Sequence, residues 1–163
     1  MSSNVGKKGY FEKGVAEAVN KAAIRGEAVA HLKKIQGKPL HNEEQNIAAT
    51  IGADQIGKLT SGTALHKSIK NGFSQAEHYM AAANVKGIFK QAKLIRTHPD
   101  KNMSEHILEM RRFEGKINLS NGTAATLLTV KKTAQHGHKI YSIELTELKK
   151  IPSDIEVGNP KSS

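Results

Sequence analysis

The spacing of hydrophobic and polar positions changes once along the chain, near residue 106. From Tyr10 to about Gln91, Ala, Glu, Lys, Gln and Leu are frequent and runs of β-branched residues are scarce, which favours helices. From about His106, apolar and polar residues alternate, as they do in half-buried strands. The pattern therefore predicts an α+β fold, in which N-terminal helices pack on one face of a C-terminal antiparallel sheet.

The N-terminal half is predicted to form a series of helices, bounded by caps and by Gly and Pro. A third, short helix is expected to be capped by Asn42, and Ser74 and Glu77 form a capping box in front of a later one. A bend is expected near Asn84. The predicted helices cover about 10–24, about 26–35, a short stretch within 41–62, a turn or two within 61–70, and 75–94.

The C-terminal half is predicted to form three long strands. They cover about 106–119, 123–133 and 139–148, with a further short edge strand near 155–157. Asn121 and Gly122 make a tight hairpin turn between the first two strands, since Asn-Gly is the strongest short signal of that kind. The three strands therefore form an antiparallel meander.

One phase shift interrupts the first of these strands. Phe113 shares a face with Leu119, whereas Met110 is out of phase with both. A β-bulge near Arg111 and Arg112 would restore the phase, because it adds one residue to one strand.

Charge is the compositional property that says most about partners. The 163 residues include 25 Lys and Arg against 15 Asp and Glu, which gives a formal net charge of +10. Such an excess favours a polyanionic partner, either nucleic acid or an acidic protein. No apolar run approaches the roughly 20 residues that a membrane-spanning helix needs. Without cysteine, the chain can form neither disulfides nor thiolate metal sites.

Two groups of residues could carry chemistry. His78 lies in a predicted helix just before the sheet, and its ordinary pKa of about 6.5 suits acid or base catalysis, although a lone helix histidine is more often a packed residue. Thr129 and Lys131 share one face of a strand, and a short turn could bring Tyr141 alongside. An amine and two hydroxyls suit a phosphodiester; the alternative is a solvated Thr-x-Lys face with Tyr141 in the core.

The remaining histidines give no comparable pattern. His136 and His138 lie together in a predicted turn, but no carboxylate triad or second histidine pair accompanies them. A defined metal site needs convergent ligands of the right number, so solvated turn histidines are the better interpretation and no metal is predicted.

Two segments carry a resemblance to a known family. "AEHYMAAANVKGIFKQAKL" and "RRFEGKINLSNGTAATLLTVKKTAQHGHKIYSIEL" resemble the barnase/EndoU/colicin/RelE superfamily of small ribonucleases. The similar branch occurs at the C-termini of bacterial polymorphic and contact-dependent inhibition toxins and in large phage-borne polyvalent proteins. The resemblance covers roughly residues 61–148. It rests on the histidine before "NVKGIFKQA", on the "TVK" strand and on the "KIYSIE" strand.

The resemblance implies a ribonuclease that uses neither a metal nor another cofactor. In such enzymes the ribose 2′-hydroxyl attacks the adjacent phosphorus and leaves a 2′,3′-cyclic phosphate. By this resemblance His78 is the acid or base, Lys131 stabilises the phosphate, and Thr129 and Tyr141 position the phosphate or ribose. Residues 61–163 would form the nuclease domain, and residues 1–60 an N-terminal helical segment, either an entry or accessory region or part of the nuclease.

Several parts of this assignment stay open. The resemblance makes Arg111, Arg112 and Lys132 further phosphate contacts, but it names no second proton-transfer group. The candidates for that group are His66, His98, Glu114 and Glu144.

The resemblance also implies partners and a setting. Its partners would be RNA, with tRNA the expected target, an acidic immunity protein that fills the basic cleft and, in some toxins, a host factor. The domain would be delivered from a secreted or cell-surface effector and act in the cytoplasm of the target cell. The alternative from another class is a non-catalytic basic module that binds nucleic acid or a partner. A DNase is weaker, because no metal constellation is evident.

Overall fold

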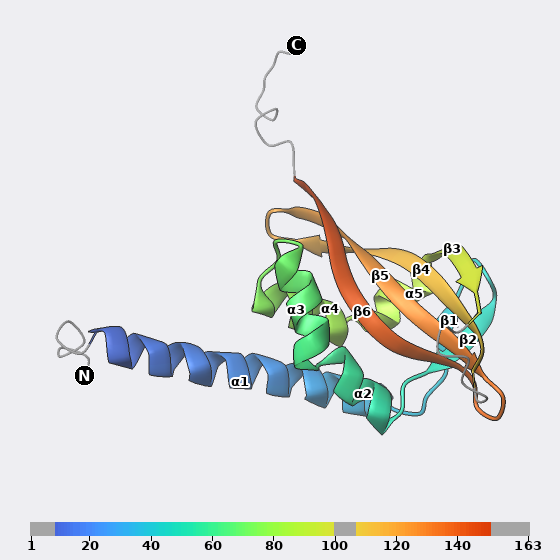
Figure 1. Ribbon diagram of the computed structural model, residues 1–163, viewed down its shortest axis with the longest axis horizontal. Coiled ribbons are helices and arrows are strands. Elements are labelled where there is room, and N and C mark those ends of the chain that lie inside the picture. The colour runs from blue at the N-terminus through green and yellow to red at the C-terminus, as the bar shows by residue number, and fades with distance from the viewer. Residues whose placement is uncertain (1–8, 100–106, 151–163) are drawn as a thin grey trace, which may run out of the picture.

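The computed structural model describes residues 9–99 and 107–150, with side chains described between positions 22 and 149. Helices along the N-terminal half are followed by a curled, mixed sheet of six strands, and the α+β prediction is confirmed (Figure 1). The edge strand predicted near 155–157 lies outside the described residues.

The helices are α1 (Gly9–Ile35), α2 (Ala53–Leu59), α3 (Gly62–Lys70), α4 (Gln75–Ala83) and α5 (Val85–Gln91). The strands are β1 (Leu40–Asn42), β2 (Ile47–Thr50), β3 (Lys93–His98), β4 (Ile107–Leu119), β5 (Gly122–Thr133) and β6 (Gly137–Lys150). In the sheet they follow the order β1-β2-β6-β5-β4-β3. The long meander β4–β5–β6 is antiparallel as predicted, but β2 pairs with β6 in parallel, so the sheet is mixed.

The short helix predicted with Asn42 as its cap is present as α2, but it begins at Ala53 with Gly52 as N-cap, and the hairpin of β1 and β2 takes up the residues around Asn42. The Asn42 side chain does not cap a helix: its amide donates to the carbonyls of Phe89 (2.7 Å) and Ala92 (2.9 Å), and its oxygen accepts from the amide of Gln45. Asn46 then turns the chain with a φ of 51°. These bonds hold the hairpin against the end of α5.

Two helix boundaries also differ from the prediction. α1 runs through Gly26 as one helix instead of two, since a single helical glycine costs only about 1 kcal/mol. α5 ends at Gln91, and the next residues form β3, which pairs with β4. Ala92 takes an extended conformation between the two elements, with its carbonyl held by Asn42.

The predicted bulge near Arg111 and Arg112 is wrong. The β4–β5 register is continuous there and shifts between Ile107 and Glu109 instead. Met110 therefore keeps its out-of-phase position and lies on the face of the sheet opposite Phe113. That opposite face carries the candidate site described below.

The core joins residues from both halves of the chain. Leu32, Leu40 and Ile51 belong to the same buried cluster as Phe89 and Phe113. The rings of Phe89 and Phe113 meet edge to face with centroids 5.3 Å apart, so α5 packs directly on β4. Burial of such aromatic and aliphatic side chains provides the main stabilisation of the fold.

Within the described residues, strand β2 covers the start of the outer edge of β6 and helices cover its continuation. β2 pairs with β6 only near His138 and Lys139. Further along β6, the hydroxyl of Ser68 accepts from the amide of Leu145 (3.1 Å), and the side chain of Asn71 donates to its carbonyl (2.9 Å). α3 is thereby fixed beside β6, and the α2–α3 junction overhangs the face of the sheet that α5 leaves open.

Candidate phosphate-binding site

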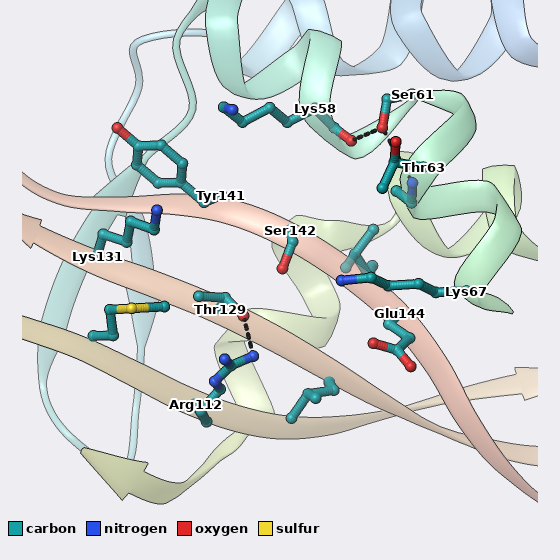
Figure 2. A pocket seen from close by; sticks show the side chains of 14 residues that line it. Lys58, Ser61, Thr63, Lys67, Arg112, Thr129, Lys131, Tyr141, Ser142 and Glu144 are labelled. Carbon is teal, nitrogen blue, oxygen red and sulfur yellow. Dashed lines mark hydrogen bonds between the residues drawn. The ribbon is translucent and has the colours of Figure 1, made fainter. Parts of the chain in front are cut away.

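A pocket of about 500 Å³ lies between the α2–α3 junction and strands β4, β5 and β6 (Figure 2). Its lining includes four cationic side chains, one carboxylate and several hydroxyls. The cations are Lys58, Lys67, Arg112 and Lys131. The carboxylate is Glu144, and the hydroxyls belong to Ser61, Thr63, Thr129, Tyr141 and Ser142.

Alternation along β5 places two predicted site residues in this pocket. Leu128 and Val130 are fully buried in the core, so Thr129 and Lys131 lie on the opposite face of the sheet. In the register with β4, Thr129 is opposite Arg112. The hydrophobic pattern thus determines which polar side chains reach the pocket.

Hydrogen bonds fix the centre of the pocket. Nη1 of Arg112 donates to Oγ1 of Thr129 at 2.9 Å, and Nε of Arg112 lies 3.4 Å from Nε2 of His98. A guanidinium held in this way presents a planar fork, and its remaining N–H groups suit two oxygens of a phosphate.

Tyr141 brings two amines together at one end of the pocket. The Nζ atom of Lys131 lies 4.5 Å from the centroid of the Tyr141 ring, and that of Lys58 lies 5.9 Å from it. Both distances are within the range of a cation–π interaction, which favours an ammonium over the ring face. Tyr141 therefore helps to hold the Lys131 amine over the sheet.

The other end of the pocket is organised by α3. Ser61 caps this helix, since its hydroxyl accepts from the amide of Ala64 (3.1 Å) and donates to the carbonyl of Lys58 (2.9 Å). Lys67 follows on the pocket side, and its amine points towards the middle of the pocket in Figure 2. Glu144 accepts a hydrogen bond from Asn71 at 3.0 Å, so its carboxylate is anchored from the same helix.

The charge of the pocket is largely uncompensated. The salt bridges found in the described part of the chain join Lys90 to Glu43 and Arg111 to Glu109, and neither includes a cation of the pocket. Among the described residues, one carboxylate therefore faces four cations. Such a concentration of positive charge attracts anions and increases their association rate.

The sequence matches the family described as large polyvalent protein-associated domain 3 over residues 20–141. The chain belongs to this family. The matched range includes α2, α3, β4 and β5 of the polyvalent protein-associated domain, and it ends at Tyr141. No curated protein and no solved structure gave a significant match. The family match agrees with the polyvalent-protein part of the resemblance and connects the domain to proteins of the polymorphic toxin type.

His78 is not part of the pocket of this polyvalent protein-associated domain. Its side chain is fully buried, with Nδ1 2.8 Å from Oγ of Ser68 and Nε2 3.1 Å from the carbonyl of Leu59. Because a carbonyl only accepts, Nε2 carries the proton and Nδ1 accepts from Ser68. Burial lowers the pKa of His78, and the hydrogen bond to Leu59 opposes this only in part. The structure therefore contradicts the expectation of a solvent-accessible acid or base, and His78 connects α2, α3 and α4.

The three predicted phosphate contacts do not all lie on the same face of the sheet. Arg112 lines the pocket, but Arg111 forms its salt bridge with Glu109, and neither Arg111 nor Lys132 lines the pocket. Lys132 is paired in register with His138. Burial, Arg111 and Lys132 lower the pKa of His138, while Glu109 raises it. Arg111 and Lys132 alternate with the pocket residues along their strands, so they cannot reach the same phosphate.

Of the four candidates for the second proton-transfer group, the structure places two at the pocket and two away from it. Glu144 lines the pocket. His98 does not line it, but contacts Arg112, which does. His66 is exposed on α3 outside the lining, and Glu114 lines a separate pocket with Glu147 and Lys149.

The sequence did not point to Lys58, Ser61, Thr63 or Lys67. Thr63 and Lys67 stand four residues apart, which places them on one helix face, but such a pair is ordinary on a solvated helix. Only the docking of α3 on β6 turns that face towards the sheet.

Two broader properties of the described residues bear on function. They contain no cluster of three or more His, Cys, Asp or Glu side chains that could bind a metal ion. Nor does any helix among them have the length and apolar character needed to cross a bilayer.

Proposed function

We propose that this chain is a metal-independent ribonuclease domain of a toxin protein and that the pocket beneath the α2–α3 junction holds the scissile phosphodiester. The observation that carries the proposal is the convergence of Arg112, Thr129 and Lys131 with Lys58 and Lys67 in one pocket. Hydroxyls and cations in this arrangement match the oxygens and the charge of a phosphodiester.

The order of groups along the sheet suits an in-line displacement. Glu144 stands opposite Leu127 in the register, Ser142 stands opposite Thr129, and Lys131 follows two residues further along β5. At about 3.3 Å per residue, the backbone positions of Leu127 and Lys131 are roughly 13 Å apart. Thr129 therefore lies between a carboxylate at one end and an ammonium at the other, as the attacking and leaving oxygens on opposite sides of phosphorus require.

In the proposed reaction, the Glu144 carboxylate takes the proton of the ribose 2′-hydroxyl. The 2′-oxygen forms a bond to phosphorus, and the bond from phosphorus to the 5′-oxygen breaks. The Lys131 ammonium gives a proton to that leaving oxygen, so that the products are a 2′,3′-cyclic phosphate and a 5′-hydroxyl. Arg112 and the amines of Lys58 and Lys67 stabilise the charge on the non-bridging oxygens, which is the usual main term in such catalysis. Tyr141 acts as a positioning residue for Lys131.

Charge and family support the setting and the partners that we propose. The family match connects the chain to polymorphic toxin-type proteins, which are delivered between cells. We extend this to action on RNA in the cytoplasm of the target cell, with tRNA as the expected substrate and with a host factor as an additional requirement in some cases. A net charge of +10 also fits an acidic immunity protein that covers the pocket.

The proposal is tested with Arg112→Gln and Lys131→Gln, each compared with Lys86→Gln, which removes an exposed charge of α5 outside the pocket. The assay incubates total tRNA and a labelled single-stranded RNA with pure protein in EDTA and identifies the end groups of the products. We expect cleavage with 2′,3′-cyclic ends by the parent protein and by Lys86→Gln, and a loss of at least about 100-fold in the two pocket variants. Unchanged cleavage by both pocket variants would refute the assignment of the site.

A second function is favoured by one observation: none of the histidines in the described part of the chain lines the pocket. The non-catalytic alternative is a module that binds RNA or a partner through the same cations. In that case, RNA stays intact with the parent protein, with or without target-cell extract, while Arg112→Gln and Lys131→Gln still weaken RNA binding. A 2′-deoxy substitution at one nucleotide separates the two functions, because it blocks transesterification and leaves the phosphate in place.

A further inference from the structure

Two further hollows adjoin the pocket at Tyr141. A second hollow of about 410 Å³ shares Lys58, Ser61 and Tyr141 with the phosphate pocket. A third, of about 350 Å³, shares Tyr141 with both and shares Asp54 and Gln55 with the second. The three hollows therefore lie next to one another around Tyr141, and together they are called the groove below.

The far end of this groove differs chemically from the phosphate pocket. Asp54 comes from the first turn of α2, Gln135 comes from the turn between β5 and β6, and Ile107 contributes an apolar wall. Acceptors and donors beside an apolar surface suit the edge and the face of a nucleobase, whereas the cations around Arg112 suit a phosphate.

The floor of the far end is held in place. Gln55 is buried, and its side-chain oxygen accepts from the amide of Gly52 at 2.8 Å. The amine of Lys139 reaches the same spot, since a Cβ added to Gly52 would lie 3.5 Å from its Nζ. Lys139 is also the register partner of Lys131 across β5 and β6. A line of cations thus continues from the phosphate pocket to the far end of the groove.

The groove is longer than one nucleotide. Along β6, Glu144 of the first hollow and Lys139 of the third are separated by five residues, or roughly 16 Å at about 3.3 Å per residue. A base can enter the third hollow only if it is unpaired, because the edges of a paired base are engaged and stacked within the duplex.

We infer that the groove binds single-stranded RNA across at least two nucleotides, with the base next to the scissile phosphate between Asp54 and Gln135 and the following phosphate at Lys139. This inference rests on the proposed function and deepens it by naming the substrate class. The Asp54 carboxylate accepts hydrogen bonds, so this subsite selects a base that presents N–H donors at its edge.

The experiment measures binding by fluorescence anisotropy with 2′-O-methyl RNA, which cannot be cleaved by transesterification. The ligands are a dinucleotide, single-stranded octanucleotides of differing sequence and a twelve-base-pair duplex. The proteins are the parent, Lys139→Gln, Asp54→Asn, Arg112→Gln and the exposed control Lys86→Gln, each checked for folding by circular dichroism. We expect the parent to bind an octanucleotide at least about ten times more tightly than the dinucleotide or the duplex.

The variants show which residues of the groove account for the tighter binding of the octanucleotide. Lys139→Gln is expected to weaken octanucleotide binding about fivefold and dinucleotide binding less than twofold, because the dinucleotide lacks the second phosphate. Asp54→Asn is expected to reduce the preference among octanucleotide sequences, since an amide donates as well as accepts. If both variants bind every ligand like the parent while Arg112→Gln weakens binding to all of them, the extended groove is refuted and the phosphate pocket stands. If Arg112→Gln also binds like the parent, the proposed function fails with it.

Discussion

The buried position of His78 leads to a prediction that separates a structural role from a catalytic one. Replacing it by Ala removes the partner of the Ser68 hydroxyl and of the Leu59 carbonyl, and both of these groups are buried. The same change leaves a cavity where α2, α3 and α4 meet. The expected result is a less stable protein whose pocket remains intact, because His78 does not line that pocket.

The magnitude follows from these contacts. A buried polar group left without a partner costs about 1–3 kcal/mol, and the cavity adds to this cost. For His78→Ala we expect the free energy of unfolding to fall by about 4 kcal/mol. In a chain of this length that corresponds to a decrease in Tm of roughly 10 °C. His78→Gln keeps an amide that can still reach one partner, so its decrease should be about half as large.

The assay has two arms. Thermal and urea unfolding, followed by circular dichroism, give the stability of the parent and of both variants. RNA cleavage and RNA binding are then measured at a temperature at which all three proteins are fully folded. We expect His78→Ala to stay within about threefold of the parent in both measurements, since a group that contributes to transition-state stabilisation typically costs 100-fold or more when removed.

The opposite pattern would refute this reasoning. If Tm changes by less than about 2 °C while cleavage is lost and binding is kept, the imidazole acts on substrate and the hydrogen bonds to Ser68 and Leu59 do not describe its role. His78→Gln sharpens the test, because an amide can replace the hydrogen bonds but cannot replace a titrating ring.

Three further predictions concern pH, packing and salt. Burial lowers the pKa of His78 and of His138, so below about pH 6.5 the unfolded chain binds protons more readily than the folded protein. The free energy of unfolding should therefore fall as the pH drops below that value, and it should fall less steeply in His78→Gln. Urea unfolding between pH 5 and 8 measures both slopes. Gly115→Ala would place a Cβ 2.6 Å from Cγ2 of Ile88 and 2.8 Å from its carbonyl oxygen, so we expect a loss of about 1–3 kcal/mol in the same assay; an unchanged Tm would contradict the close packing of α5 on β4. Lys131→Gln should reduce the slope of log Kd for single-stranded RNA against log salt concentration by about 0.7, and an unaltered slope would place the amine away from phosphate.

Local signals in the sequence predicted much of the fold. The capping box of Ser74 and Glu77 is present, with hydrogen bonds of 3.1 and 2.8 Å, and Asn84, where a bend was expected, is the C-cap of α4. The turn at Asn121 and Gly122 also joins the predicted strands. Each of these features depends on residues only a few positions apart, so their pattern is visible in a short window.

The missed elements depend on distant partners. Ile47–Thr50 is too short to show alternation, and it becomes a strand by pairing with β6, about 90 residues further along the chain. The site was predicted only in part, because some of its residues also meet only through contacts between distant parts of the chain. Alternation in β5 identified Thr129 and Lys131 as neighbours on one face, but it could not show that α3 would bring Lys67 over them. Nor could it tell a buried imidazole at position 78 from an accessible one.

Asn71 links two properties that are usually separate. Its side-chain amide donates both to the Leu145 carbonyl, on the edge of β6 that α3 covers, and to the Glu144 carboxylate. An unpaired strand edge is a template for adding a strand from another molecule, and this amide occupies one of its acceptors. A substitution of Asn71 would release the Glu144 carboxylate and would also expose the edge of β6 at Leu145. Resistance to aggregation and the geometry of the pocket are therefore under the same constraint, and neither can be altered here without disturbing the other.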